Sequence, residues 1–166
     1  MPTSVLHVSD LHRDSGSQLS TAALLDSLRR DRERYVRDEA IPAPDLAIIS
    51  GDIVYGVKAN EVDADAKLEA QYNEAYDFLV QLADTFFGGR RERVVIVPGN
   101  HDVSLPHVHR ATTIVDIPAD AAQRAMLSQQ LSAANSTLRW DWADLTARRI
   151  INLDEYHRRL APFANF

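Results

Sequence analysis

The stretch Val94–Val103, VVIVPGNHDV, runs from four apolar residues through Pro-Gly into the polar trio Asn100, His101 and Asp102. A short apolar run bounded by turn residues is typical of a buried strand. Ligand sites of open α/β sheets gather at the carboxyl ends of such strands. The stretch therefore predicts a third buried strand at 93–97 and a polar site where it ends.

Two further apolar runs precede it, SVLHVS at 4–9 and DLAIIS at 45–50. Between the three runs, apolar residues recur at helical spacing over 20–39 and 61–86. Ser20 or Thr21 is the expected N-cap of the first helix, and Gly88-Gly89 ends the second. Strand, helix, strand, helix, strand requires two crossovers, so we expect a layered α/β domain on a parallel βαβαβ sheet.

The pattern changes after Pro106. Residues 119–134 and 153–163 have helical patterns, and 113–115 could form a short strand. Arg148-Arg149 and Arg158-Arg159 are interpreted as solvated helical faces, with phosphate contacts as the alternative. We therefore expect a core over 1–106 and a helical cap or insertion over 107–166, which the chain leaves incomplete.

Composition is that of a soluble globular protein: 166 residues, 45% hydrophobic, 25% charged and no cysteine. The amino-terminal residues lack the features of a signal peptide, and no apolar run is long enough to span a bilayer. A cytoplasmic protein without membrane contact is the expectation. Residues 1–106 carry 11 basic against 18 acidic residues, which makes nucleic acid a less favoured partner.

Each expected strand ends in side chains that can bind metal ions. Asp10 and His12 follow the first strand, Asp52 the second and Asn100 the third. Two residues apart on extended backbone, Asp10 and His12 can face the same side and hold one ion. Asp52 could bridge two ions about 3.5–4 Å apart, and the Asn100 amide would bind the second. The sequence predicts a metal centre at this edge of the sheet.

His101 and Asp102 come directly after Asn100 and suit proton transfer. An imidazole beside metal ions can protonate a leaving oxygen, and a neighbouring carboxylate can orient its ring. We therefore assign both residues to catalysis.

The motifs SDLH, SGDIV and VPGNHDV resemble those of the calcineurin-like metallophosphoesterase superfamily, over about the first 105 residues. The resemblance implies a two-layered β-sandwich flanked by helices, of which this chain holds half, and a two-metal centre that cleaves phosphate esters. It also implies that Asp10 and His12 hold the first metal, Asp52 bridges and Asn100 holds the second. By the same resemblance His101 is the catalytic histidine.

The chain departs from the superfamily pattern after Asp102, because the later lone His and the Gly-His-x-His block are absent. The later histidines are His107, His109 and His157, none of them preceded by Gly. The HVH of 107–109 comes too soon after GNHD and is interpreted as a loop, with a replacement ligand pair as the alternative. His157 is expected at the surface. An incomplete domain should leave an apolar edge or face of its sheet exposed.

The first hypothesis is a phosphoesterase that uses two divalent ions of Mn, Fe or Zn on a phosphomonoester or phosphodiester. The alternative is a non-catalytic interaction or regulatory module derived from such an enzyme, and a nuclease is a third. A second copy of the chain or a partner chain could supply the missing ligands.

Overall fold

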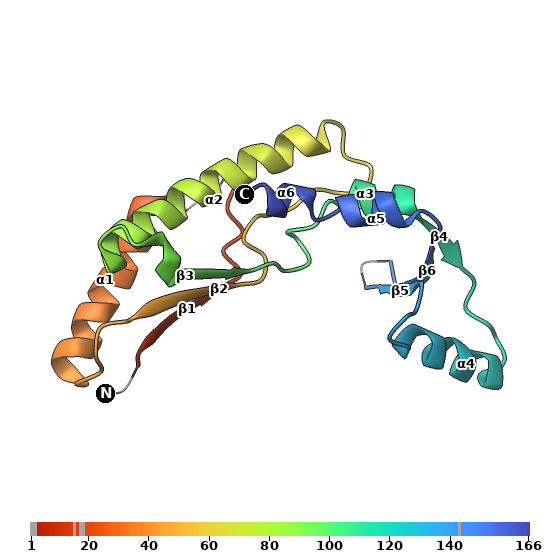
Figure 1. The fold of residues 1–166 in the computed structure, drawn as a ribbon, viewed down its shortest axis with the longest axis horizontal. Helices are drawn as coiled ribbons and strands as arrows, with labels where there is room; N and C mark the ends of the chain where they lie inside the picture. The colour runs from red at the N-terminus through yellow and green to blue at the C-terminus, as the bar shows by residue number, and fades with distance from the viewer. Residues whose placement is uncertain (1–2, 15, 17–18, 143) are drawn as a thin grey trace. The chain divides into compact units, whose positions relative to one another are not determined.

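The computed structural model describes residues 3–14, 16, 19–142 and 144–166, and the chain divides into two compact units. The first comprises Met1–Ser104 and Leu160–Phe166, and the second Leu105–Arg159. In Figure 1 the elements of the first unit are β1 (Val5–Ser9), α1 (Thr21–Asp38), β2 (Leu46–Ser50), α2 (Ala64–Phe87), the 3₁₀-helix η1 (Arg91–Arg93), β3 (Val94–Val97) and α6 (Ala161–Ala164).

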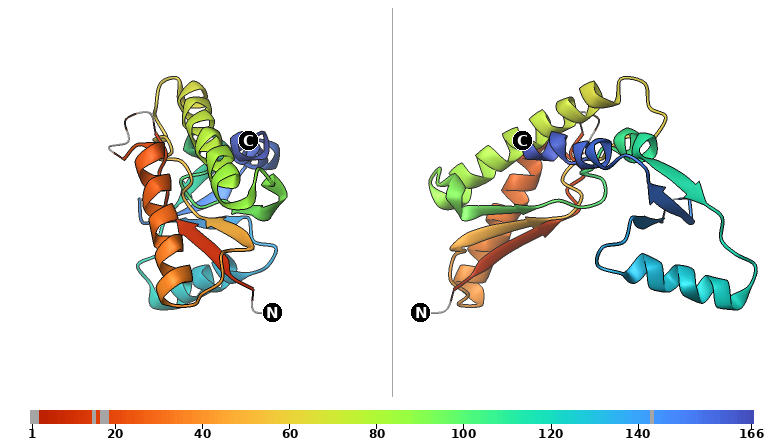
Figure 2. Two further views of the ribbon diagram at one scale, coloured as in Figure 1. Left: turned by 90° about the vertical axis from the view of Figure 1, so that its left-hand side faces the viewer. Right: turned by 45° about the vertical axis from the view of Figure 1, so that its right-hand side comes forward.

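The sheet of the first unit is parallel, with strand order β1-β2-β3, as expected. Its register pairs Val5 with Leu46, and Ile48 with both His7 and Val95. Right-handed crossovers between successive neighbouring strands place both connecting helices on one face. Figures 1 and 2 show α1 and α2 on the same side of this sheet.

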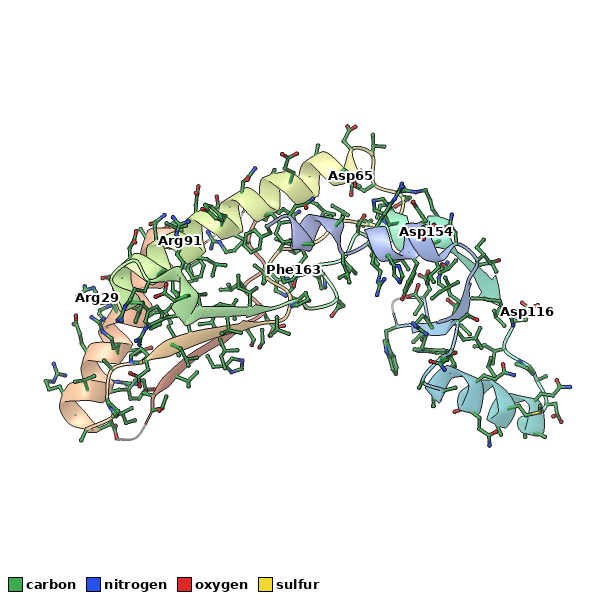
Figure 3. All side chains as sticks on the ribbon, in the orientation of Figure 1. Arg29, Asp65, Arg91, Asp116, Asp154 and Phe163 are labelled. Atoms are coloured by element: carbon green, nitrogen blue, oxygen red, sulfur yellow. The ribbon has the colours of Figure 1, made fainter. Side chains whose placement is uncertain are left out.

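The face beneath α1 and α2 holds the core. Ala47 and Ile49 of β2 are fully buried there, and Leu68, Phe78 and Leu82 of α2 cover them. Phe163, labelled in Figure 3, and Phe166 bring the carboxyl-terminal segment against the same core. This face gives the sheet its main stabilisation, because apolar area is removed from water there.

The opposite face of the sheet is open. Val5, Val95 and Val97 keep nearly half of their surface exposed. The prediction that the third strand is buried is therefore wrong for this face, where alternate residues of β3 meet solvent. The expectation of an exposed apolar sheet face is confirmed.

The two long helices lie close to their expected bounds of 20–39 and 61–86, although α2 begins only at Ala64. Ser20 caps α1, and its Oγ accepts a hydrogen bond from the Ala23 N–H at 3.2 Å. Gly88 ends α2 in the left-handed conformation, with φ of 62°. This conformation is readily available to glycine, which has no Cβ.

The second unit contains a small antiparallel sheet with strand order β4-β6-β5. Its elements are α3 (Leu105–Ala111), β4 (Thr112–Val115), α4 (Ala121–Ser132), β5 (Leu138–Asp141), β6 (Thr146–Ile150) and α5 (Leu153–Arg158). The helices expected at 119–134 and 153–163 are present as α4 and as α5 with α6, and β4 is the short strand expected at 113–115. β5 and β6 were not expected. The interpretation of residues 107–166 as a cap stays a prediction.

Two interpretations in this region are wrong. Arg148 lies on β6 rather than on a helix and is only 7% exposed, because its guanidinium pairs with Asp141 at 2.9 Å. His107 and His109 lie on α3 rather than in a loop. His157 is exposed on α5, as expected.

No helix in the described part of the chain combines the length and apolar character needed to cross a bilayer.

Candidate metal centre

Asp10, His12 and Asp52 converge just beyond the carboxyl ends of β1 and β2. Each contributes one ligand atom to a group whose members all lie within 4.8 Å of one another. All three have positive φ, at 54°, 45° and 43°. A non-glycine residue in this region is strained, and such strain concentrates at functional sites. Two carboxylates and an imidazole thus point at one place.

Backbone hydrogen bonds between the two ligand segments hold this arrangement. The Asp10 N–H donates to the Gly51 carbonyl at 3.3 Å, and the His12 N–H donates to the Asp52 carbonyl at 2.9 Å. The Arg13 N–H continues the series to the Ile53 carbonyl at 2.8 Å. The pairing of β1 and β2 therefore extends past the strand ends and holds Asp10, His12 and Asp52 relative to each other.

The segment after β3 is pressed against Asp52. A Cβ added to Gly99 would overlap the backbone nitrogen and Oδ1 of Asp52, so only glycine permits this approach. The His101 N–H donates to Asp52 Oδ1 at 2.9 Å. Asn100 lies between Gly99 and His101 in the chain, so its backbone is held next to Asp52.

The His101 imidazole lies beside the His12 ring, with ring centroids 5.0 Å apart and planes at 85°. Its Nδ1 is 2.6 Å from the Tyr55 carbonyl. A carbonyl oxygen only accepts, so Nδ1 carries the hydrogen of this bond. The other ring nitrogen, Nε2, is thereby left for acid–base chemistry.

Asp102 occupies a different environment from the one expected. Its carboxylate is fully buried and accepts from the backbone N–H groups of Ile53, Val54 and Gly99 at 2.7–3.1 Å. The Tyr72 hydroxyl donates to the Asp102 carbonyl at 2.9 Å, and burial, followed by the Asp102 charge, raises the pKa of Tyr72. Asp102 thus joins the segments that follow β2 and β3, while the His101 ring is held by Tyr55.

The donor set fits a divalent metal ion. His12 Nδ1 is buried and has no hydrogen-bond partner among the residues that the structure describes. A buried polar atom without a partner is costly, and an incoming ligand would relieve that cost. Carboxylate oxygens and imidazole nitrogen without thiolate suit Mn, Fe or Zn.

A second His–Asp group, formed by His109, Asp141 and Asp144 in the other unit, is of a different kind. Arg148 Nε lies 2.9 Å from Asp141 Oδ2, and Arg148 Nη2 lies 3.5 Å from Asp144 Oδ2. His109 Nδ1 is 3.4 Å from the same guanidinium. The Arg148 guanidinium therefore already supplies a cation to this group, which makes it a partly exposed ion-pair network.

Sequence reasoning missed two residues beside the candidate centre. The Tyr55 ring centroid lies 6.0 Å from that of His12, and Arg13 follows His12 and pairs with Glu74. Arg13 directly follows His12 in SDLHR and Tyr55 follows the SGDIV motif, so proximity to the motifs was the available signal. Neither residue type is a common metal ligand, so the spacing of ligand residues gives no signal for them.

A family model for calcineurin-like phosphoesterases matches residues 3–153. The match covers most of the chain, including the motifs that carry the candidate metal centre and much of the second unit. The chain belongs to the calcineurin-like phosphoesterase family. The comparison with curated proteins gave no match.

Proposed function

We propose that the chain is a metal-dependent phosphoesterase that hydrolyses a phosphomonoester or phosphodiester by a two-metal mechanism. One observation carries the proposal. Asp10, His12 and Asp52 converge from the ends of β1 and β2, and the backbone N–H of His101, which follows β3, donates a hydrogen bond to Asp52. Family membership supports the same chemistry. A cytoplasmic setting belongs to this proposal as well.

Asp10 and His12 would hold the first ion, Asp52 both ions, and Asn100 the second. Bound Mn, Fe or Zn ions supply positive charge that polarises a phosphoryl oxygen and lowers the pKa of water. Asp52 Oδ1 already accepts a hydrogen bond from the His101 N–H, so its carboxylate keeps a fixed orientation. The protein's part is to preorganise these ligands.

His101 is proposed to transfer a proton to the departing oxygen of the ester. The Tyr55 carbonyl fixes the ring through Nδ1, which directs Nε2 to the acid–base role. The His12 ring packs against the imidazole and restrains its rotation. The Asp102 carboxylate accepts hydrogen bonds from the backbone N–H groups of Ile53 and Gly99, and so holds the segments next to Asp52 and Asn100 in place.

Metal stoichiometry tests the proposal most directly. After the purified chain is soaked in Mn²⁺ and desalted, elemental analysis should find about two ions per chain. Asp52→Asn should lose them, whereas Asp65→Asn, which removes an exposed carboxylate of α2, should keep them. Metal content equal in the Asp52→Asn variant and the wild type would overturn the proposed site.

Hydrolysis of bis(p-nitrophenyl) phosphate then tests catalysis. Mn²⁺-dependent turnover should fall by roughly 10²–10⁴-fold in His101→Gln, the range for loss of a general acid, with Mn²⁺ content unchanged. Full activity of that variant would remove His101 from the mechanism.

A non-catalytic module is the second candidate. In the described part of the chain, a single His–Asp group of three ligands lies at these strand ends, and three ligands suffice for one ion rather than two. One ion per chain without turnover would favour this candidate. Two ions would favour a centre completed by Asn100, a second copy or a partner chain.

A further inference from the structure

Tyr55 is an exposed aromatic residue at the metal centre. Its side chain keeps 61% of its surface exposed. Its ring centroid lies 6.0 Å from that of His12 and 6.3 Å from that of His101. This ring is open to solvent beside two histidines of the candidate site, so its face is available to a ligand bound there.

The backbone that carries the Tyr55 ring is held on both sides. The Tyr55 N–H donates to the Arg13 carbonyl at 3.4 Å, and the Tyr55 carbonyl accepts from His101 Nδ1. The next residue, Gly56, exchanges two hydrogen bonds with the Gln71 side chain, at 2.8 Å and 3.2 Å. The backbone that carries the ring is therefore held in place, and binding has only the side-chain torsions of Tyr55 left to order.

Close packing at Gly56 reinforces this platform. A Cβ added to Gly56 would lie 2.9 Å from the His101 carbonyl oxygen and 3.2 Å from His101 Nδ1, and its φ is 82°. Only glycine allows the chain after Tyr55 to approach the imidazole so closely. Tyr55 and His101 thus form one rigid substructure.

The Tyr55 hydroxyl makes no hydrogen bond within the residues that the structure describes. The side chain therefore serves neither the core nor an internal hydrogen-bond network. What it offers is an aromatic face next to the atoms that would meet a phosphate. Stacking on a planar group is the interaction for which such a face is suited.

We propose that Tyr55 is a specificity-determining residue that stacks the planar aromatic group of a phosphate ester, as in a nucleoside monophosphate. This inference rests on the proposed function, because the phosphate of that ester binds at the Asp10–His12–Asp52 group. In a nucleotide the sugar separates the base from the phosphate. A phosphate bound at Asp10, His12 and Asp52 therefore leaves the base free to reach the Tyr55 ring. The acidic first part of the chain, with 18 acidic against 11 basic residues, favours a single nucleotide over a polymer.

Equilibrium binding to the Mn²⁺-loaded full chain tests this inference without requiring turnover. Calorimetric titration with adenosine 5′-monophosphate should give binding roughly tenfold tighter than titration with ribose 5-phosphate, which lacks the base. Tyr55→Leu, which keeps bulk and removes the aromatic face, should abolish the difference, and Tyr55→Phe should retain it. Tyr35→Ala, which removes an exposed tyrosine of α1, should leave it unchanged.

Equal affinity of the wild type for the two ligands, or a base preference that survives in Tyr55→Leu, would overturn the role of Tyr55. Mn²⁺-dependent binding of ribose 5-phosphate that disappears in Asp52→Asn would leave the proposed phosphate site intact in that case. If ribose 5-phosphate fails to bind the Mn²⁺-loaded wild type, the phosphate site is absent and the inference falls with it. Unchanged Mn²⁺ affinity in Tyr55→Leu serves as the check that the variant is folded.

Discussion

Arg13 Nη2 lies 2.7 Å from Glu74 Oε1, so a side chain that directly follows the proposed metal ligand His12 is paired with the middle of α2. The Arg13 side chain is 3% exposed, and its guanidinium also donates to Thr21 Oγ1 at 2.9 Å and to the Leu19 carbonyl at 3.2 Å. The segment that carries Asp10 and His12, two proposed metal ligands, is thereby attached to the start of α1 and to α2. The helices that cover the sheet thus also position the site.

Glu74→Gln should weaken both folding and metal binding. The substitution leaves the buried Arg13 guanidinium without its counter-charge, which should lower the free energy of unfolding by about 1–3 kcal/mol. Mn²⁺ affinity should fall by about tenfold, as for other groups that support metal ligands. Urea unfolding and Mn²⁺ titration measure the two effects.

Glu33→Gln is the matched control. It breaks the ion pair of Glu33 with Arg29, in which both partners are nearly half exposed, and exposed pairs contribute about 0–1 kcal/mol. Equal behaviour of the Glu74 and Glu33 variants would show that Arg13 has no positioning role.

The regular part of the fold was predictable because its sequence signals are local. Apolar runs locate β1, β2 and β3, and the spacing of apolar residues locates α1 and α2. The rule that carboxyl ends of parallel strands share an edge brings Asp10, His12 and Asp52 together. Positive φ values and the approach of Gly99 to Asp52 depend on three-dimensional packing and have no local signal.

β5 and β6 were missed because ion pairs, rather than apolar side chains, bury part of their sheet. The β6 sequence TARRI places Arg148 at a buried position, which hydrophobic patterning counts as exposed. Its neutralisation by Asp141 comes from the adjacent strand and is visible only once the strands pair. Where charged pairs from neighbouring strands fill buried positions, the alternation of apolar and polar residues that predicts a strand is lost.

Asp102 should prove to be a structural residue. Asp102→Ala leaves the N–H groups of Ile53, Val54 and Gly99 without their acceptor, and each such buried donor costs about 1–3 kcal/mol. Asp102→Asn keeps one acceptor oxygen and should lose less stability. Chemical denaturation of the metal-free chain measures the free energy of unfolding of each variant. A purely catalytic role of Asp102 predicts no change in that free energy.

Ser104→Ala provides the comparison for Asp102. Ser104 is fully buried, and its hydroxyl has no hydrogen-bond partner among the described residues. Its removal should therefore cost little or stabilise the chain. A stability loss as large as that of Asp102→Ala would contradict the assignment of the effect to the carboxylate.

The open face of the parallel sheet should bind a hydrophobic dye. Val5, Val95 and Val97 present apolar surface there, and exposed apolar patches bind such dyes or associate with one another. Val95→Thr with Val97→Thr should lower dye fluorescence and concentration-dependent association. Met126→Thr, which changes an exposed apolar residue of α4, should not. A monodisperse monomer with negligible dye binding would show that this face neither binds apolar molecules nor associates in solution.

Glu155 should make the stability of the second unit depend on pH. Glu155 Oε1 accepts from Arg110 Nε at 2.7 Å and lies 3.0 Å from His107 Nδ1, which joins α5 to α3, and Arg158 lies 3.6 Å from Oε2. The hydrogen bond from Arg110, followed by that from His107, holds the pKa of Glu155 below its ordinary value of 4.5. The carboxylate therefore stabilises the fold above that value, and its contribution is lost as pH falls through the lowered pKa.

Glu155→Gln should accordingly be less stable than the wild type at pH 7, and the gap should shrink as pH falls below 4.5 through the lowered pKa of Glu155. Urea unfolding at a series of pH values from neutral to acid measures the gap. Asp154→Asn removes an exposed carboxylate from the same turn of α5 and controls for the change in net charge. A gap that persists at the acid pH would mean that Glu155 acts through packing, and a gap of equal size in Asp154→Asn would assign the effect to the α5 dipole rather than to Arg110 and His107.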